Sequence, residues 1–253
     1  MSVRYEIQDH IATITIARPE ALNSISLDTW TALSEATQKL EADKNVWVGI
    51  ITGEGERAFS AGADLKTTVP ALLEGKAPES PVLWRGQRIT KPLIAAINGL
   101  ALGGGLEIAL SCDIRIAAEG VRLGLPEVGL GIIPDWGGTQ RLPRQVPWAI
   151  AAQMIFTGEP ITTADALRIG LINAVVPADR VMVEARRMAE RICQMGPLAV
   201  QAAKRAMVEG SSMSLEDGLA FEREQFRSLA KTRDVQEGLT AFLEKRPPQF
   251  KGE

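Results

Sequence analysis

The sequence predicts an α/β fold with parallel strands, and three observations support this prediction. Short apolar runs of strand length recur through the first part of the chain. Each run is followed by a glycine-rich loop or a helix-length segment, an alternation that is typical of parallel sheets. From residue 148 onward the apolar spacing is mostly helical. We therefore expect an α/β core at residues 1–195 and a helical C-terminal region at residues 196–253.

Composition limits the classes of protein to consider. The chain has 253 residues, of which 45% are hydrophobic, enough to bury a sizeable core. Its net charge of −3 gives no general attraction to nucleic acid or to an anionic membrane. Cys112 and Cys193 are too few for a disulfide framework and indicate thiols in a reducing compartment. Because the start lacks a signal segment, we expect a cytoplasmic protein that binds neither nucleic acid nor membrane.

The first elements are expected to be a hairpin and a helix. Residues 5–7 and 11–16 are rich in β-branched side chains, and His10 lies in the predicted turn between them. Ser26 is a suitable N-cap for a helix over residues 27–42, and residues 46–52 are an apolar run typical of a buried strand. His10 is the only histidine, so no clustered zinc ligands and no convincing Ser-His-Asp triad are available.

The middle of the chain continues the alternation. Residues 53–66 are expected to be a loop, and residues 70–81, with three prolines, to be mobile. The run KPLIAAIN predicts a buried strand, GLALGGG leads into a helix ending near Cys112, and DIRIAA predicts another strand. Later segments, from PWAIAAQMIFTG to LEDGLAFEREQF, fit helical spacing. No internal repeat is visible.

The run of three glycines, Gly103 to Gly105, is the first candidate for chemistry. Neither a Walker A sequence nor the dinucleotide pattern G-x-G-x-x-G is present. Glycines at a helix start let a ligand approach free amides, and the helix dipole there favours negative charge. If the loop FSAGADLK presents the amide of Ala63 opposite that of Gly104, the two form an oxyanion hole. Alternatively, both loops are only tight connections.

Two carboxyl groups accompany these amides. Glu107 follows Gly104 by three residues, so both occupy one face of a short helix. Glu127 lies in the apolar segment RLGLPEVGLGIIP, where burial raises the pKa of a carboxyl group. Two such acids beside an oxyanion hole suit proton transfer next to a thioester carbonyl. The alternative is that each is an ordinary solvated glutamate.

Three long motifs resemble one family. AFSAGADLK, INGLALGGGLEIALSCDIRIA and LPEVGLGIIPDWGGTQRLPR are similar, in this order, to the enoyl-CoA hydratase/isomerase (crotonase) family. The resemblance extends from the RPEALNS turn to the FLEKRPPQFKG tail. It implies a crotonase-like spiral of ββα units with a helical C-terminal region, assembled as a homotrimer or homohexamer.

The resemblance also implies a site. It places the oxyanion hole at the amides of Ala63 and Gly104 and the two acids at Glu107 and Glu127. It implies substrate contacts from the loop positions Ala61, Ala63, Asp64, Leu65 and Lys66. The implied reaction adds water to a trans-2-enoyl-CoA, with Glu127 transferring the proton at Cα and Glu107 positioning and activating water. Coenzyme A is part of the substrate, and no metal or other cofactor is implied.

Asp135 and Trp136, also expected to contact substrate, depart from the pattern of many simple hydratases. Those enzymes have a small neutral residue at the position of Asp135, whereas some isomerases and dehalogenases of the family have a working carboxylate there. The alternative activity is therefore an enoyl-CoA or dienoyl-CoA isomerase that uses Glu127 and Asp135. The sequence PDWGG also suits a simple turn. An RNA-binding relative is disfavoured because no lysine cluster is present.

Two further expectations concern the pocket and the assembly. The segment of residues 67–91, with Trp84, is expected to shape the acyl pocket together with Asp135 and Trp136. Apolar side chains at Leu215, Leu219 and Phe226 suggest a surface that a lone subunit leaves uncovered. In a trimer, a basic tail with Lys245, Arg246 and Lys251 could reach the coenzyme A phosphates of a neighbour.

Overall fold

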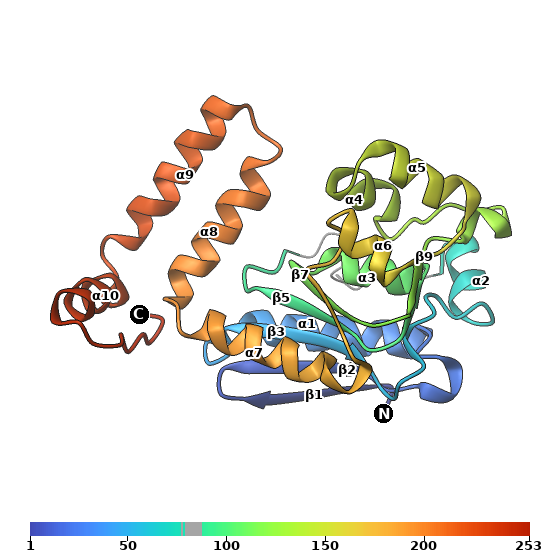
Figure 1. Cartoon of the computed structure of the whole chain (residues 1–253), viewed down its shortest axis with the longest axis horizontal. Helices are drawn as coiled ribbons and strands as arrows, with labels where there is room; N and C mark the ends of the chain where they lie inside the picture. The colour runs from blue at the N-terminus through green and yellow to red at the C-terminus, as the bar shows by residue number, and fades with distance from the viewer. Residues whose placement is uncertain (77, 79–87) are drawn as a thin grey trace.

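The computed structural model describes residues 1–76, 78 and 88–253, which fold around two sheets (Figure 1). The larger sheet has the strand order β1-β2-β3-β5-β7-β10. Its strands are β1 (Val3–Gln8), β2 (Ile11–Ile16), β3 (Val48–Gly53), β5 (Leu93–Ile97), β7 (Ile114–Ala118) and β10 (Ala174–Val176). Apart from the antiparallel pair β1 and β2, its neighbouring strands are parallel. The predicted α/β fold with parallel strands is confirmed.

The smaller sheet has the order β4-β6-β8-β9. Its strands are β4 (Ala58–Ser60), β6 (Leu100–Leu102), β8 (Arg122–Gly124) and β9 (Ile161–Thr162). The first three run parallel to one another, and β9 pairs antiparallel with β8. The carboxyl ends of β4, β6 and β8 therefore lie at one edge of this sheet.

The two sheets and the helices between them repeat one unit. Each unit has a strand of the larger sheet, a strand of the smaller sheet and then helical structure. β3 and β4 lead to α2 (Thr68–Leu73), and β5 and β6 lead to α3 (Gly104–Ser111). β7 and β8 lead to the 3₁₀ turn η3 (Glu127–Leu130) and α4 (Gly138–Gln145). This is the expected spiral of ββα units.

The larger sheet lies between two apolar layers, because side chains alternate across each strand. In β5, Leu93 packs in one layer, with α1 (Leu27–Ala42) and α3. Its neighbour Ile94 faces the other layer, which α7 (Val181–Cys193) covers. Burial on both faces explains why the strands are almost uniformly apolar in sequence.

Two predictions about the N-terminal part are confirmed. His10 and Asp9 form the tight turn between β1 and β2 with positive φ angles, and His10 is exposed. Its ring stacks on Trp47 with the centroids 4.0 Å apart. Helix α1 begins after Ser26, whose hydroxyl oxygen accepts a hydrogen bond from the amide of Thr29.

The sequence missed the short elements. Strands β4 and β6 lie within segments expected to be loops, and β8, β9, β10 and α4 were not anticipated. Strands of two or three residues are too short to show a periodicity. Of the residues 70–81 that were expected to be mobile, residues 70–73 belong to α2, residues 77 and 79–81 lie outside the described residues, and the mobility of the segment stays a prediction. This helix is anchored at its start, where the hydroxyl of Thr68 donates to the carbonyl of Ile25 at 2.7 Å. Trp84 lies outside the described residues.

The C-terminal helices stand apart from the sheets in Figure 1. These helices are α8 (Pro197–Gly210), α9 (Leu215–Leu229) and α10 (Arg233–Glu244). Two further helices, α5 (Trp148–Thr157) and α6 (Thr163–Arg168), precede α7 in the chain. α8 and α9 pack against each other, and the chain after α10 folds back so that Asp234 accepts hydrogen bonds from the amides of Lys251 and Gly252. In the part of the chain that the structure describes, every helix is too short or too polar to cross a membrane.

Candidate active site

The candidate site lies where β4, β6 and β8 end. Ala63 lies in the loop after β4, Gly104 follows β6 as the first residue of α3, and Glu127 follows β8 at the start of η3. Because these three strands are parallel neighbours, their loops meet at the same edge of the smaller sheet. Segments that are 23 to 64 residues apart in sequence are in this way brought around one cavity of about 1050 Å³.

The amides of Ala63 and Gly104 are presented to this cavity. Ile25 forms a parallel bridge to Ala63, with its amide donating to the carbonyl of Gly62 and its carbonyl accepting from the amide of Asp64. In such a bridge the N–H of the middle residue, Ala63, points to the opposite side. A side chain on Gly62 would come within 2.8 Å of the Gly104 nitrogen, so the two loops are in contact. Among the described residues, neither the Ala63 nor the Gly104 amide has a hydrogen-bond acceptor.

Gly103 shapes the approach to Glu127. Its φ of +54° is a conformation that side-chain-bearing residues rarely adopt, and a Cβ there would lie 2.8 Å from Oε1 of Glu127. The absence of a side chain therefore lets the Glu127 carboxyl group pack against the backbone at the start of α3. The other oxygen of Glu127, Oε2, is buried and has no hydrogen-bond partner among the described residues. An unpartnered buried carboxyl oxygen at a cavity is a candidate proton-transfer group.

The carboxyl group of Glu107, unlike Oε2 of Glu127, is fixed by a hydrogen bond. Its side chain is only 2% exposed, and Oε1 accepts a hydrogen bond of 2.7 Å from the amide of Gly138. Gly138 is the first residue of α4, so the carboxyl group lies at the positive end of a helix dipole. A Cβ on Gly138 would come within 3.0 Å of this oxygen. The sequence did not identify this contact, although the glycine pair in PDWGGTQ was a signal for it.

Both carboxyl groups have raised pKa values. Burial raises the pKa of Glu107 to about 8, with the Gly138 hydrogen bond acting in the opposite direction and the charges of Glu127 and Asp135 adding to the rise. Burial also raises the pKa of Glu127 to about 7, and the charge of Asp135 adds to this. Near neutral pH the pair can therefore hold and exchange a proton, as the sequence predicted for Glu127.

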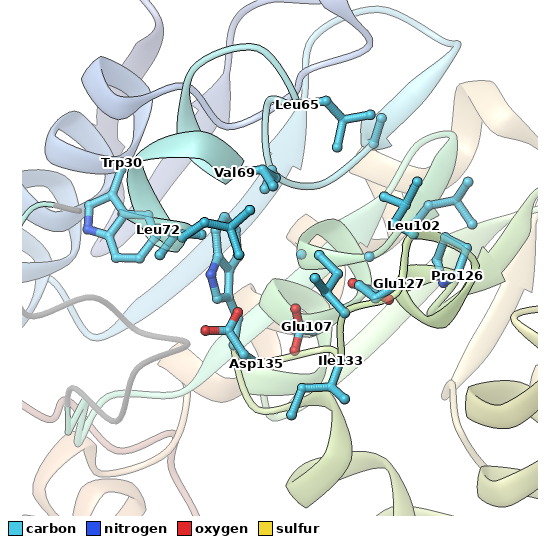
Figure 2. Close-up of a pocket in the computed structure, with 18 of the residues that line it drawn as sticks. Trp30, Leu65, Val69, Leu72, Leu102, Glu107, Pro126, Glu127, Ile133 and Asp135 are labelled. Atoms are coloured by element: carbon cyan, nitrogen blue, oxygen red, sulfur yellow. The ribbon is translucent and has the colours of Figure 1, made fainter. Parts of the chain in front are cut away.

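Asp135 and Trp136, in the chain between η3 and α4, both line the cavity but differ in burial. Trp136 is buried, packs edge to face on Trp30 with ring centroids 5.1 Å apart, and covers the position where Gly104 would bear a side chain. Asp135 is exposed and lines the cavity. Figure 2 shows its carboxylate on the side of the pocket away from Leu65, with Glu107 between Asp135 and Glu127.

The carboxylate of Asp64 faces Arg18 instead of the cavity. Its Oδ2 accepts from both terminal nitrogens of Arg18 at 3.3 Å, and its Oδ1 accepts from the amides of Lys66 and Thr67. Burial acts to raise the pKa of Asp64, but the hydrogen bonds from Lys66 and Arg18 and the charge of Arg18 outweigh it, so the pKa is lowered. The sequence did not connect Arg18 with the site.

Most residues expected from the sequence line the cavity. They are Ala61, Ala63, Leu65, Gly104, Glu107, Glu127, Asp135 and Trp136. Asp64 and Lys66 are adjacent in the chain but are not among the described lining residues, so their contact with substrate stays a prediction. Val69 and Leu72 line the cavity from the segment of residues 67–91 that was expected to shape the acyl pocket. Trp30 and Ile133 add apolar walls that the sequence had not identified (Figure 2).

The spiral of ββα units around such a cavity defines a crotonase-type enzyme. The crystal structure of an enoyl-CoA hydratase from Bacillus anthracis matches this fold with a TM-score of 0.93 and 39% sequence identity, covering 100% of both chains. Curated relatives include the short-chain-enoyl-CoA hydratase of Clostridium acetobutylicum, 43% identical over 97% of this chain and 95% of the relative. The 2,3-dehydroadipyl-CoA hydratase of Escherichia coli is 42% identical over 97% and 96%.

The family model described as enoyl-CoA hydratase/isomerase matches residues 6–253. The chain therefore belongs to the enoyl-CoA hydratase/isomerase family, as its three motifs indicated.

Proposed function

We propose that this enzyme adds water across the double bond of a trans-2-enoyl-CoA. The observation that carries the proposal is the meeting of two acceptor-free amides and two carboxyl groups of raised pKa at one cavity. The thioester oxygen accepts hydrogen bonds from the amides of Ala63 and Gly104, which stabilise it as it becomes enolate-like. The hydratase names of the similar proteins support the same reaction.

The two glutamates divide the proton transfers. Glu107 takes a proton from water as the water oxygen bonds to Cβ, and Glu127 gives a proton to Cα. The hydrogen bond from Gly138 favours ionised Glu107, which suits a base, and the partnerless Oε2 of Glu127 suits an acid. Because the pKa values of both carboxyl groups are raised, the assignment of the two roles rests on these hydrogen-bond contacts, and exchange of the Cα proton tests it. The reaction requires no metal and no cofactor beyond the coenzyme A of the substrate.

Assembly as a homotrimer or homohexamer accompanies this proposal. Large apolar side chains on α8 to α10 are exposed in the single chain, and they include Met207, Val208, Leu215, Leu219, Phe226, Leu239, Phe242 and Leu243. In the assembly, the helical C-terminal region at residues 196–253 would bury these side chains against neighbouring subunits. Of the basic tail, Arg246 is already paired with Glu237 and Glu244 of its own chain, which leaves Lys245 and Lys251 as candidates for a neighbour's coenzyme A. We place the enzyme in the cytoplasm, without nucleic-acid or membrane partners.

The competing activity is double-bond isomerisation with Glu127 and Asp135. The position of Asp135 at the cavity is the observation that favours it. A panel of 2-enoyl-, 3-enoyl- and dienoyl-CoA substrates, assayed with one preparation, separates the two. We expect measurable hydration of crotonyl-CoA, with a smaller loss in Asp135→Asn than the 10²-fold or more typical of losing a proton-transfer group. Isomerase activity far above hydratase activity, abolished in Asp135→Asn, would show that the main reaction is isomerisation.

A further inference from the structure

The turn of residues 136–138 holds the carboxyl group of Glu107 in place. Gly138, at the start of α4, donates its amide to Oε1 of Glu107 at 2.7 Å. Gly137 before it has a φ of +108°, a conformation that a residue without a side chain adopts easily. The two peptide groups on either side of Gly137 therefore decide where the Gly138 amide points.

Arg141 contacts both of these peptide groups. Its side-chain nitrogen Nη1 donates to the carbonyl of Trp136 at 3.0 Å, which fixes the peptide group between Trp136 and Gly137. Its backbone amide donates to the carbonyl of Gly137 at 2.7 Å, which fixes the next peptide group. That second peptide group carries the N–H that Gly138 gives to Glu107. One residue thus holds the whole turn in the conformation that presents the donor.

The charge of Arg141 also reaches Glu107. Helix α4 packs against α3, which carries Glu107, and the Arg141 side chain is half-buried there. Burial lowers the pKa of Arg141, whereas the charges of Glu107 and of Cys112, at the end of α3, act to raise it. Glu127 and Asp135 act on Glu107 as like charges. The positive charge of Arg141 opposes them and favours ionised Glu107.

We propose that Arg141 is a positioning residue for the acid–base site, which holds the turn of residues 136–138 so that Gly138 keeps its hydrogen bond to Glu107. This inference rests on the proposed hydration of enoyl-CoA, in which Glu107 is the base. Arg141 is not among the described residues that line the cavity, so it acts through Glu107 and not on the substrate. An arginine suits this position because it stays charged and its planar group directs its N–H donors.

The test removes the guanidinium group and follows the hydration of crotonyl-CoA. We expect kcat of Arg141→Gln to fall about tenfold to a hundredfold with KM little changed, because the base is misdirected while the cavity keeps its lining. Loss of the positive charge also favours protonated Glu107. The pH optimum of kcat/KM in Arg141→Gln should therefore rise by about half a unit.

Arg141→Lys separates the charge from the geometry. It keeps the charge, so its pH optimum should stay at the wild-type value, while kcat falls about threefold to tenfold because lysine lacks the directed N–H donors. The matched control is Arg144→Gln on the same helix, since Arg144 is exposed and donates to Gln140 one turn earlier in α4. This control should keep the wild-type kcat and pH optimum.

An infrared titration of the carboxyl groups, with Glu107→Gln identifying the band of Glu107, measures the pKa of this group without substrate. This pKa should rise in Arg141→Gln. Wild-type kcat, pH optimum and Glu107 titration in Arg141→Gln would overturn the inference, even if the variant were less stable. Should Arg141→Gln not fold, wild-type kcat in Arg141→Lys would overturn it. A wild-type enzyme that does not hydrate crotonyl-CoA would overturn the proposed function, and the infrared titration would still decide the role of Arg141.

Discussion

The guanidinium group of Arg18 and the carboxylate of Asp64 form an ion pair at 3.3 Å, one residue beyond the amide of Ala63. The same carboxylate accepts hydrogen bonds from the amides of Lys66 and Thr67. One side chain thus connects the turn before α1 to the chain that leads into α2, and the loop of Ala63 is held between them. Asp64 is therefore placed to act as a positioning residue for the oxyanion hole.

Asp64→Asn removes the charge of this pair at nearly unchanged size. We expect kcat to fall about tenfold because the Ala63 amide is less firmly directed, while KM changes little. Loss of charge-assisted hydrogen bonds should also lower the free energy of unfolding by about 1–3 kcal/mol. The control is Glu54→Gln, which removes the more exposed pair with Arg4. A loss of stability with kcat unchanged would mean that Asp64 has only a structural role.

Glu107→Gln and Glu127→Gln should each reduce hydration by about 10² to 10⁴-fold, the range for general acid–base groups. Binding of the thioester should persist, because the amides of Ala63 and Gly104 remain. Exchange of the Cα proton of a saturated acyl-CoA with deuterated solvent distinguishes the roles. Glu127→Gln should lose this exchange, and Glu107→Gln should retain more of it. Near-normal turnover in both variants would refute the assignment.

The raised pKa values predict a bell-shaped profile of kcat/KM against pH. Hydration needs one ionised and one protonated carboxyl group, and the pair with pKa values of about 7 and about 8 shares one proton mainly between these values. Activity should therefore be greatest near pH 7 to 8 and fall on both sides. A profile that is flat from pH 6 to 9 would contradict this.

The same shifts predict how stability depends on pH. Because folding raises both pKa values from 4.5, the folded state binds more protons than the unfolded state between about pH 4.5 and 8. The contribution of these two carboxyl groups to the free energy of unfolding is complete below about pH 4.5 and is lost as pH rises to about 8. Glu107→Gln removes the titrating group, so its free energy of unfolding should fall less over this range than that of the wild-type enzyme, as chemical denaturation can measure.

Gly104→Ala tests the packing at the start of α3. The new Cβ would overlap the indole ring of Trp136, which is buried against Trp30. We expect a loss of about 1–3 kcal/mol in the free energy of unfolding, as for other overpacked sites, and a lower kcat. The matched control is Gly129→Ala, where a Cβ meets nothing within 4 Å. A Gly104→Ala variant as stable and active as this control would contradict the packing in the structure.

The exposed apolar side chains of α8 to α10 predict self-association. Light scattering at micromolar concentration should give a mass of three or six subunits. Phe242, which is 82% exposed on α10, offers a variant, because Phe242→Asp should weaken an apolar interface. A wild-type monomer at this concentration would refute the prediction.

The sequence by itself determined the long elements and the family. Helix α1 with its Ser26 cap and the strand pair around His10 follow from local patterns, since each is decided by neighbouring residues. The motifs around Gly104 and Glu127 identified the family, and the position of Glu107 three residues after Gly104 predicted a shared face. In each case the relevant residues lie within one turn or one element.

The tertiary structure alone decided how the site is assembled. The parallel pairing of β4, β6 and β8, each too short to show a periodicity, brings the loops of Ala63, Gly104 and Glu127 to one sheet edge. The contacts of Arg18 with Asp64 and of Gly138 with Glu107 span 46 and 31 residues. Local propensity carries no information about such distant pairs, because they form only when separate strands and helices pack. For the same reason the raised pKa of Glu107, which depends on burial, could be read only from the folded chain.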